Sequence, residues 1–197
     1  MSRMVSLVLA ARPAVAMPAA PWLAPWGTST LIDHVLRGVR AWPVEPGIVV
    51  LGADAEAVLE GADLAGFTVV IDPEWEEGRA APLRAGVDEL TRQTDITSFV
   101  LTAADIPGIG ADVVGDLVAA HATHDRAVTV PMYRYARGRP LIVRRDLWPR
   151  LLGLEDDAGI DALLQTHPSW VEELRVDALA PRTIATPDDL VEMRPRH

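Results

Sequence analysis

The chain contains no cysteine and no lysine among its 197 residues. The absence of cysteine excludes disulfides and thiolate metal sites, and it favours a reducing compartment, so we expect a cytoplasmic protein. All 18 basic residues are arginines. A lysine Schiff base, a lysine general base and a lysine phosphate clamp are therefore excluded.

Positive charge is also scarce, because the 18 basic residues face 28 acidic ones and the net charge is -10. A field of this sign repels nucleic acid and anionic lipid, so we expect neither as a partner. No apolar run approaches the ~18 residues that a membrane-spanning helix needs, so we expect no membrane insertion. Apolar residues still make up 49% of the chain, which is typical of a globular domain.

The N-terminus allows two interpretations. Arg3, the apolar run 4–11 and the small residues 14–16 are similar to a secretory signal with its cleavage site. Arg12 and Pro13 cut the apolar run short, however, and the run is also typical of a buried first strand. We adopt the strand and keep the signal peptide as the alternative.

Short β-branched runs alternate with helical patterns for most of the chain. Strands that are apolar on both faces and are joined by helices are typical of a parallel sheet covered on both sides. The expected strands are 4–10, 47–51, 67–71 and 99–102, and the expected helices are 31–39, 53–59, 82–90 and 113–118. We therefore predict an α/β protein with a three-layer, Rossmann-like fold and a mostly parallel sheet.

The pattern then changes. Runs 128–130 and 140–143 lie close together, so we expect a strand, an excursion and a returning strand that is a candidate for antiparallel pairing. Thr186-Pro187 opens a final helix with a cap and a first-turn proline. Between these segments we expect helices at 147–152 and 160–166 and a strand at 171–176. Because we find no repeat and no linker, we expect residues 1–197 to form a single domain.

The first candidate site is the loop that follows the first strand. In open parallel sheets, ligands bind beyond the carboxyl ends of the strands, and the first such loop often holds nucleotide phosphates through backbone N–H groups. This loop begins with Leu9, Ala10, Ala11 and Arg12, and it has no glycine before Gly27. Four prolines within it each remove an N–H donor. The alternative is a loop that merely covers the sheet.

The second candidate is Asp105, which follows the buried strand 99–102. A carboxylate just past a buried strand loses hydration unless it has a partner. Mg²⁺ is the expected partner where phosphates are nearby, because one carboxylate plus substrate oxygens is its usual ligand pattern. Alternatively, Asp105 caps the helix that begins near Ala111 or braces the turn at Pro107.

Four other groups of residues can carry chemistry, each with a structural alternative. The acidic run 155–157 suits a cation or a solvated surface. His121 and His124 suit a shared metal, although two ligands fall short of a typical site. Trp22 and Trp26 either lie exposed beside the first loop or pack on the first helix. The segment with Tyr133, Arg134, Tyr135, Arg137 and Arg139 either covers an anionic substrate or forms a mobile solvated loop.

Taken in order, these segments resemble the molybdenum cofactor cytidylyltransferases and guanylyltransferases, the MobA-like nucleotidyltransferases. The family begins with LAAG-x-S-x-RMG-x-x-K, and its later motifs are W-x-x-G, S-L-x-x-G, D-x-P, G-x-P, G-D-x-G and a closing D-I-D-T-P-E-D-L. The resemblance covers almost the whole chain. The matching segments are Leu9-Ala10-Ala11, Trp75 to Gly78, Leu83 to Gly86, Leu101 to Pro107, Gly138-Arg139-Pro140, Asp157-Ala158-Gly159 and Ile184 to Leu190.

The resemblance implies a nucleotidyltransferase (GT-A-like) fold and Mg²⁺-dependent transfer of CMP or GMP from CTP or GTP to molybdopterin or a related phosphorylated acceptor. It makes Asp105 the metal ligand and, with Arg12, a catalytic residue. A homodimer or a partner enzyme is also expected. The nucleotide-binding residues that it implies are Leu9, Ala10, Ala11, Arg12, Gly78, Leu83 and Gly86.

The chain also departs from the family pattern. Arg12 replaces the first loop glycine, Ala16 the arginine and Pro18 the second glycine, while Pro21 falls where the lysine belongs. Thr183 and Ala185 replace two acidic residues near the end of the chain. Three hypotheses follow: an active nucleotidyltransferase, in which Arg12 replaces the missing cations; a non-catalytic nucleotide-binding or partner subunit; and a sheet domain used only for dimerisation.

Overall fold

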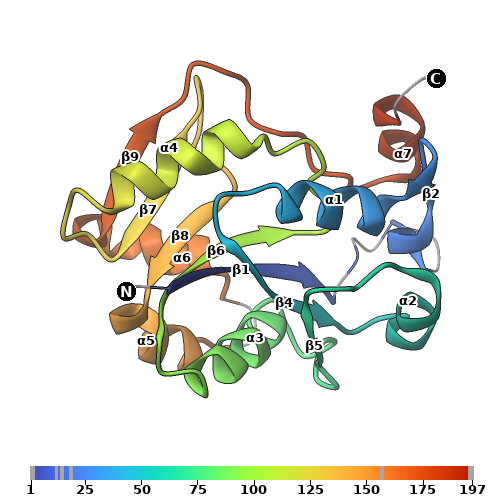
Figure 1. Cartoon of the computed structure of the whole chain (residues 1–197), viewed down its shortest axis with the longest axis horizontal. Coiled ribbons are helices and arrows are strands. Elements are labelled where there is room, and N and C mark those ends of the chain that lie inside the picture. Colours follow the sequence, from blue (N-terminus) through green and yellow to red (C-terminus); the bar gives the residue numbers. More distant parts are fainter. Residues whose placement is uncertain (1–2, 12, 14–15, 18–19, 156–157, 195–197) are drawn as a thin grey trace.

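Seven strands form one sheet in the order β5-β4-β1-β6-β8-β7-β9 in the computed structural model, which describes residues 3–11, 13, 16–17, 20–155 and 158–194 (Figure 1). Strand β8 pairs antiparallel with β6 and β7, and every other neighbouring pair is parallel. The predicted mostly parallel sheet and the antiparallel return are therefore confirmed. The strands are β1 (Arg3–Ala10), β4 (Glu45–Leu51), β5 (Thr68–Ile71), β6 (Ile96–Ala103), β7 (Val128–Met132), β8 (Leu141–Arg144) and β9 (Val171–Arg175).

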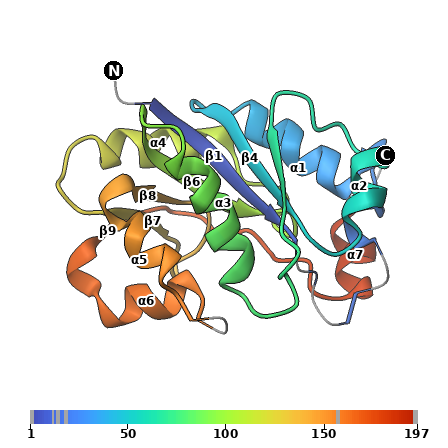
Figure 2. The same cartoon turned by 90° about the horizontal axis from the view of Figure 1, so that it is seen from below.

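Helices cover both faces of the sheet, as predicted. In Figure 1, α1 and α4 lie above the strands and α3 and α5 below them, and Figure 2 shows α3, α5 and α6 in front of the sheet. Strand β1 shows why both faces need a cover, because its apolar side chains point to both sides of the sheet. Leu7 packs into the core on the α3 side, and Val8 packs into the core on the α1 side. The helices are α1 (Leu31–Arg40), α2 (Ala55–Gly61), α3 (Ala81–Thr91), α4 (Ala111–His121), α5 (Trp148–Leu152), α6 (Ile160–Thr166) and α7 (Pro187–Met193).

The connections create a switch point beside β1. From β1 the chain crosses to β4 and β5 on one side, and it then returns to β6 on the other side. Loops that leave the carboxyl ends of β1 and β6 therefore diverge, which leaves a crevice where ligands bind in sheets of this kind. The two ends are tied together, because the Ala104 N–H donates to the Leu9 carbonyl at 2.9 Å.

The first loop packs closely against the body of the protein. Trp22, in the 3-10 turn η1 (Pro21–Leu23), and Trp26, in the short ribbon of β2 (Pro25–Trp26) and β3 (Ser29–Thr30), are each only 3% exposed. Both belong to the same core cluster as α1. The tryptophans therefore pack on the first helix, and the exposed alternative is wrong. The ribbon itself is too short to be predicted from sequence pattern.

Most expected element positions are confirmed, with shifts at the ends. Strand β6 begins at Ile96, earlier than expected, because the polar Ser98 is buried inside the sheet. Helix α2 begins at Ala55, later than expected, because Asp54 has a left-handed backbone with φ 57°. The capping box at Thr186 is confirmed. Within the residues that the structure describes, none of the helices is long and apolar enough to cross a membrane.

We expect Arg145→Ala to destabilise the fold by about 3 kcal/mol. The Arg145 guanidinium donates to three backbone carbonyls between α3 and β6, those of Thr91 at 2.9 Å, Gln93 at 2.7 Å and Ile96 at 2.8 Å. It also lies 4.7 Å from the centre of the Trp148 ring. Truncation leaves the carbonyls without this donor, and chemical denaturation measures the loss.

Two further variants make that measurement specific. Arg145→Lys should recover little stability, because one ammonium cannot reproduce a planar fork that reaches three carbonyls. Arg92→Ala is the matched control, since the Arg92 side chain is 65% exposed and pairs with Asp88 and Glu89 of the helix that it caps. Its loss should stay below about 1 kcal/mol. Equal effects of Arg145→Ala and Arg92→Ala would contradict the structural role of Arg145.

Candidate active site

The candidate site lies where β1, β4 and β6 end. Leu9 and Ala10 close β1, and both Ala10 and Ala11 are buried. The Leu9 carbonyl accepts from Ala104 N–H at 2.9 Å, and the Ala11 carbonyl accepts from Ala53 N–H at 2.8 Å. These bonds hold the three strand ends at one rim, which we call the carboxyl rim. Arg12 lies outside the described residues.

Asp105 lies on this rim, one residue past Ala104. Its Oδ1 atom is buried and has no hydrogen-bond partner among the described residues. Its main-chain carbonyl accepts from Ile184 N–H at 2.7 Å, so the C-terminal segment holds it in place. The helix-capping alternative is wrong, because the N-cap of α4 is Gly110.

The environment of Asp105 makes its carboxyl harder to ionise in the ligand-free protein. Burial raises the pKa of this carboxyl to about 6, against the opposing charge of Arg139. A buried carboxylate oxygen without a partner costs free energy, which a cation would remove. Asp105 therefore fits the divalent metal that the resemblance implies.

A cation at Asp105 would find few other protein ligands. No three His, Cys, Asp or Glu side chains gather into a metal-binding group in the part of the chain that the structure describes. Asp161 pairs with Arg139, and Asp156 and Asp157 lie outside the described residues. One carboxylate completed by substrate and water oxygens is a pattern that Mg²⁺ accepts.

The segment between β5 and α3 reaches the same rim. A Cβ atom on Gly52, just after β4, would lie 2.6 Å from the Trp75 Cβ and 2.7 Å from the Ala11 carbonyl oxygen. Only glycine therefore lets Trp75 approach the end of β1 so closely. Gly78, three residues further on, is buried.

Leu83 and Gly86 lie beneath the rim, in α3. Leu83 is buried in the core. A Cβ on Gly86 would lie 2.6 Å from Leu7 Cδ1 and 3.0 Å from Val50 Cγ2, so this glycine lets α3 pack tightly on the sheet. Their positions support the rim from below, and a direct contact with a nucleotide stays a prediction.

Asp72 is a further acidic residue on the rim, which we did not predict as a functional residue. It follows β5 directly and is only 3% exposed, and burial raises the pKa of its carboxyl. Its Oδ1 accepts from Glu74 N–H at 3.0 Å, whereas its buried Oδ2 lacks a partner within the described ranges. An acidic residue directly after a strand was the signal that drew attention to Asp105, and the same signal points to Asp72.

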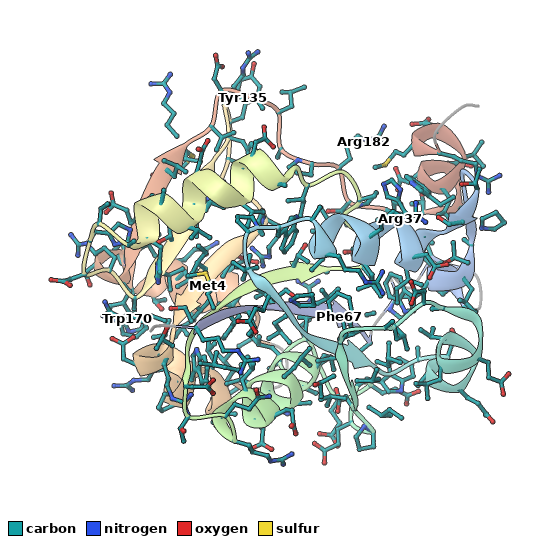
Figure 3. The ribbon with its side chains drawn as sticks, in the orientation of Figure 1. Met4, Arg37, Phe67, Tyr135, Trp170 and Arg182 are labelled. Atoms are coloured by element: carbon teal, nitrogen blue, oxygen red, sulfur yellow. The ribbon has the colours of Figure 1, made fainter. Side chains whose placement is uncertain are left out.

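The arginines of the 133–139 segment are all engaged with carboxylates. Arg134 pairs with Asp177 and Arg137 with Glu173, and Arg139 donates two hydrogen bonds to Asp161. Tyr133 is buried, and Tyr135 is 87% exposed at the tip of a projection in Figure 3. The segment is thus held by ion pairs.

The two histidines serve a structural purpose. The His121 ring lies 2.7 Å from Thr129 Oγ1 through Nδ1 and 3.3 Å from Ser98 Oγ through Nε2, and His124 Nε2 lies 3.2 Å from the same Thr129 hydroxyl. Burial lowers the pKa of His121 to about 4, helped by the neighbouring His124 and Arg144. Both ring nitrogens of His121 are occupied, which leaves the shared-metal hypothesis without support.

A family model, the MobA-like NTP transferase domain, matches residues 7–172. The chain belongs to this family. The resemblance seen in the motifs is therefore confirmed, and so is a Rossmann-like nucleotidyltransferase fold. The matched range includes the carboxyl end of β1, Asp72, Asp105 and Arg139, so the carboxyl rim is built from family elements.

Solved structures agree with the assignment of this chain to the family. The homologue of Rv0371c from Mycobacterium sp. strain JC1 has a TM-score of 0.85 and 30% identity, over 97% of this chain and 94% of that one. A manganese complex of Rv0371c from Mycobacterium tuberculosis H37Rv has a TM-score of 0.81 and 26% identity, over 98% of each chain. The second structure shows that a related protein of this fold holds a divalent cation.

One relative of this chain is named for an activity other than nucleotide transfer. The nicotine blue oxidoreductase of Paenarthrobacter nicotinovorans is 25% identical over 160 residues, which cover 77% of this chain and 76% of that protein. Family membership therefore assigns an NTP transferase domain to this chain and leaves the acceptor to be argued from the site.

Proposed function

We propose that this chain, acting as one domain over residues 1–197, binds CTP or GTP with Mg²⁺ at the carboxyl rim. In this proposal it transfers the nucleoside monophosphate to molybdopterin or a related phosphorylated acceptor. The observation that carries the proposal is Asp105 at the switch point between β1 and β6, a carboxylate with a buried oxygen that has no partner among the residues the structure describes. The family match over residues 7–172 supports it.

The rim residues have distinct roles in this proposal. Ionised Asp105 holds the cation, which when bound neutralises charge on the α-phosphate. Leu9, Ala10 and Ala11 form the edge against which the triphosphate lies, and Arg12 supplies a catalytic positive charge. Gly78, Leu83 and Gly86 support the pocket for the base. The acceptor oxygen attacks the α-phosphorus in line, and the bond to the departing pyrophosphate breaks.

A second candidate, a non-catalytic nucleotide-binding or partner subunit, is favoured by the first loop. Pro21 and Trp22 of this loop are buried in the structure, and the four prolines cannot offer N–H groups to a phosphate. Each missing electrostatic contact costs about a hundred- to a thousandfold in rate. Turnover far below that of an enzyme with a complete loop is therefore expected even if nucleotide still binds.

Two measurements test the proposal. Calorimetry of the purified protein with CTP and GTP, each with Mg²⁺ and with Mn²⁺, should show binding that disappears when the metal is chelated. Pyrophosphate release from the four NTPs, with molybdopterin or a sugar phosphate as acceptor, then separates the two candidates. Binding without release supports the non-catalytic nucleotide-binding subunit. If neither CTP nor GTP shows metal-dependent binding, both the enzyme and the nucleotide-binding subunit are refuted, and only a partner subunit that binds no nucleotide is left.

A further inference from the structure

The antiparallel pairing of β8 with β6 brings the segment that ends at Arg139 to the end of β6 that leads into Asp105. Leu141 of β8 pairs with Leu101 of β6 in antiparallel register. Because β8 begins at Leu141, the preceding residues Arg139 and Pro140 lie beside the end of β6 that leads into Asp105. Arg139 therefore approaches the carboxyl rim from the β8 side, whereas the first loop approaches it from the β1 side.

The structure holds Arg139 firmly at its backbone and only lightly at its head group. The Tyr133 hydroxyl donates to the Arg139 carbonyl at 2.9 Å. The guanidinium, 22% exposed, donates to both carboxylate oxygens of Asp161 at 2.9 and 2.8 Å, and Asp161 is 64% exposed. An ion pair with so exposed a partner contributes little to stability. The same planar fork that binds a carboxylate also matches a phosphate.

Arg134 and Arg137 provide an internal comparison. They belong to the same segment, and they pair with Asp177 and Glu173 on the chain that follows or forms β9. If the segment attracted phosphate only through its overall positive charge, substitution of any of the three arginines would weaken phosphate binding equally.

We propose that Arg139 supplies a phosphate-binding cation in place of the lysine that the first loop lacks. Its guanidinium leaves Asp161 and binds a phosphate group of a substrate beside Asp105, so that Asp161 is its partner only in the ligand-free protein. The identity of the substrates rests on the proposed function. The phosphate belongs either to the nucleotide or to the acceptor, and the two sources share the same chemistry.

The test compares Arg139→Gln, Asp161→Asn and Arg137→Gln with the wild-type protein. Each is titrated with inorganic pyrophosphate, with Mn²⁺ and CTP or GTP, and with inorganic phosphate in the presence of saturating nucleotide. We expect Arg139→Gln to weaken phosphate binding by about tenfold to a hundredfold. Asp161→Asn should strengthen it several-fold, because the competing carboxylate is removed, and Arg137→Gln should leave it unchanged.

The outcomes separate the possible sources and the possible failures. A loss in the pyrophosphate and nucleotide titrations assigns Arg139 to the nucleotide, and a loss confined to inorganic phosphate assigns it to the acceptor. Unchanged binding by folded Arg139→Gln, or an equal loss in Arg137→Gln, overturns the inference. A loss in Asp161→Asn as large as that in Arg139→Gln does so too, since it would show a structural pair.

The inference and the proposed function also fail in different ways. If the wild-type protein binds nucleotide and Arg139→Gln binds it equally well, the inference is wrong and the function stands. If the wild-type protein binds pyrophosphate through Arg139 but no nucleotide with metal, the function is wrong and the inference stands. Should Arg139→Gln not fold, the tighter binding expected of Asp161→Asn still decides, because a structural pair predicts the opposite sign.

Discussion

Asp105→Asn is expected to abolish metal-dependent nucleotide binding and at the same time to stabilise the ligand-free protein. The substitution keeps the shape of the side chain and removes the charge that would hold the cation, so binding should weaken by at least about a hundredfold. Near pH 8 the ionised carboxylate is buried without a partner for Oδ1 in the described part of the chain. Replacing it with a neutral amide should raise the free energy of unfolding by about 2 kcal/mol.

Calorimetry with Mn²⁺ and CTP measures the first effect, and urea unfolding in the presence of a chelator measures the second. Asp112→Asn is the matched control, because Asp112 is an exposed carboxylate in the first turn of α4. It should change neither quantity. A stability loss in Asp105→Asn without a change in nucleotide binding would mean that Asp105 only braces the turn at Pro107, and the proposed metal site would then be abandoned.

The second large effect is a pair of opposing contributions to the pH dependence of stability. In the folded protein the pKa of Asp105 is about 6, above its ordinary 3.8, so the folded state binds this proton more readily. Its contribution to stability therefore grows as the pH falls from about 6 to 4. The pKa of His121 is about 4, below its ordinary 6.5, so the unfolded chain binds that proton more readily. Its contribution is lost over nearly the same range.

Each contribution amounts to about 2 kcal/mol after allowance for partial solvent screening. The two should nearly cancel in the wild-type protein between pH 6.5 and 4, and single substitutions should reveal them. Asp105→Asn should lose stability on acidification more steeply than wild type, while His121→Gln should lose less or gain. Urea unfolding at half-unit pH intervals in the presence of a chelator gives the three profiles. Parallel profiles would rule out the inferred environments of both groups.

The expected elements of the sheet were largely correct because their signals are local. The runs that became β1 and β4 are apolar at consecutive positions, as strands covered on both faces must be. The errors concern segments whose structure depends on distant partners. Ser98 was left out of the predicted strand because it is polar. Its hydroxyl is buried against His121, a residue on a later helix that the local sequence does not reveal as its partner.

The candidate site was predicted in part for the same reason. Asp105 was found because the carboxyl ends of parallel strands meet at one rim, so an acidic residue after a buried strand could be placed there from sequence. Asp72 carries the same signal, because it directly follows the predicted strand 67–71, but no functional role was predicted for the acidic residue at the end of that strand. The partner of Arg139 could not be predicted, because Asp161 lies 22 positions away in a separate helix.

The sequence by itself determined the layered α/β fold, the family and the absence of a lysine clamp. Apolar periodicity, motif order and composition are properties of the chain that need no knowledge of contacts. Only the tertiary structure decided which charged groups are satisfied and which are not. It left oxygens of Asp72 and Asp105 without partners within the described residues, and it gave Arg139 to Asp161. Desolvation and ion pairing depend on neighbours that folding brings from distant segments, and a linear pattern does not contain them.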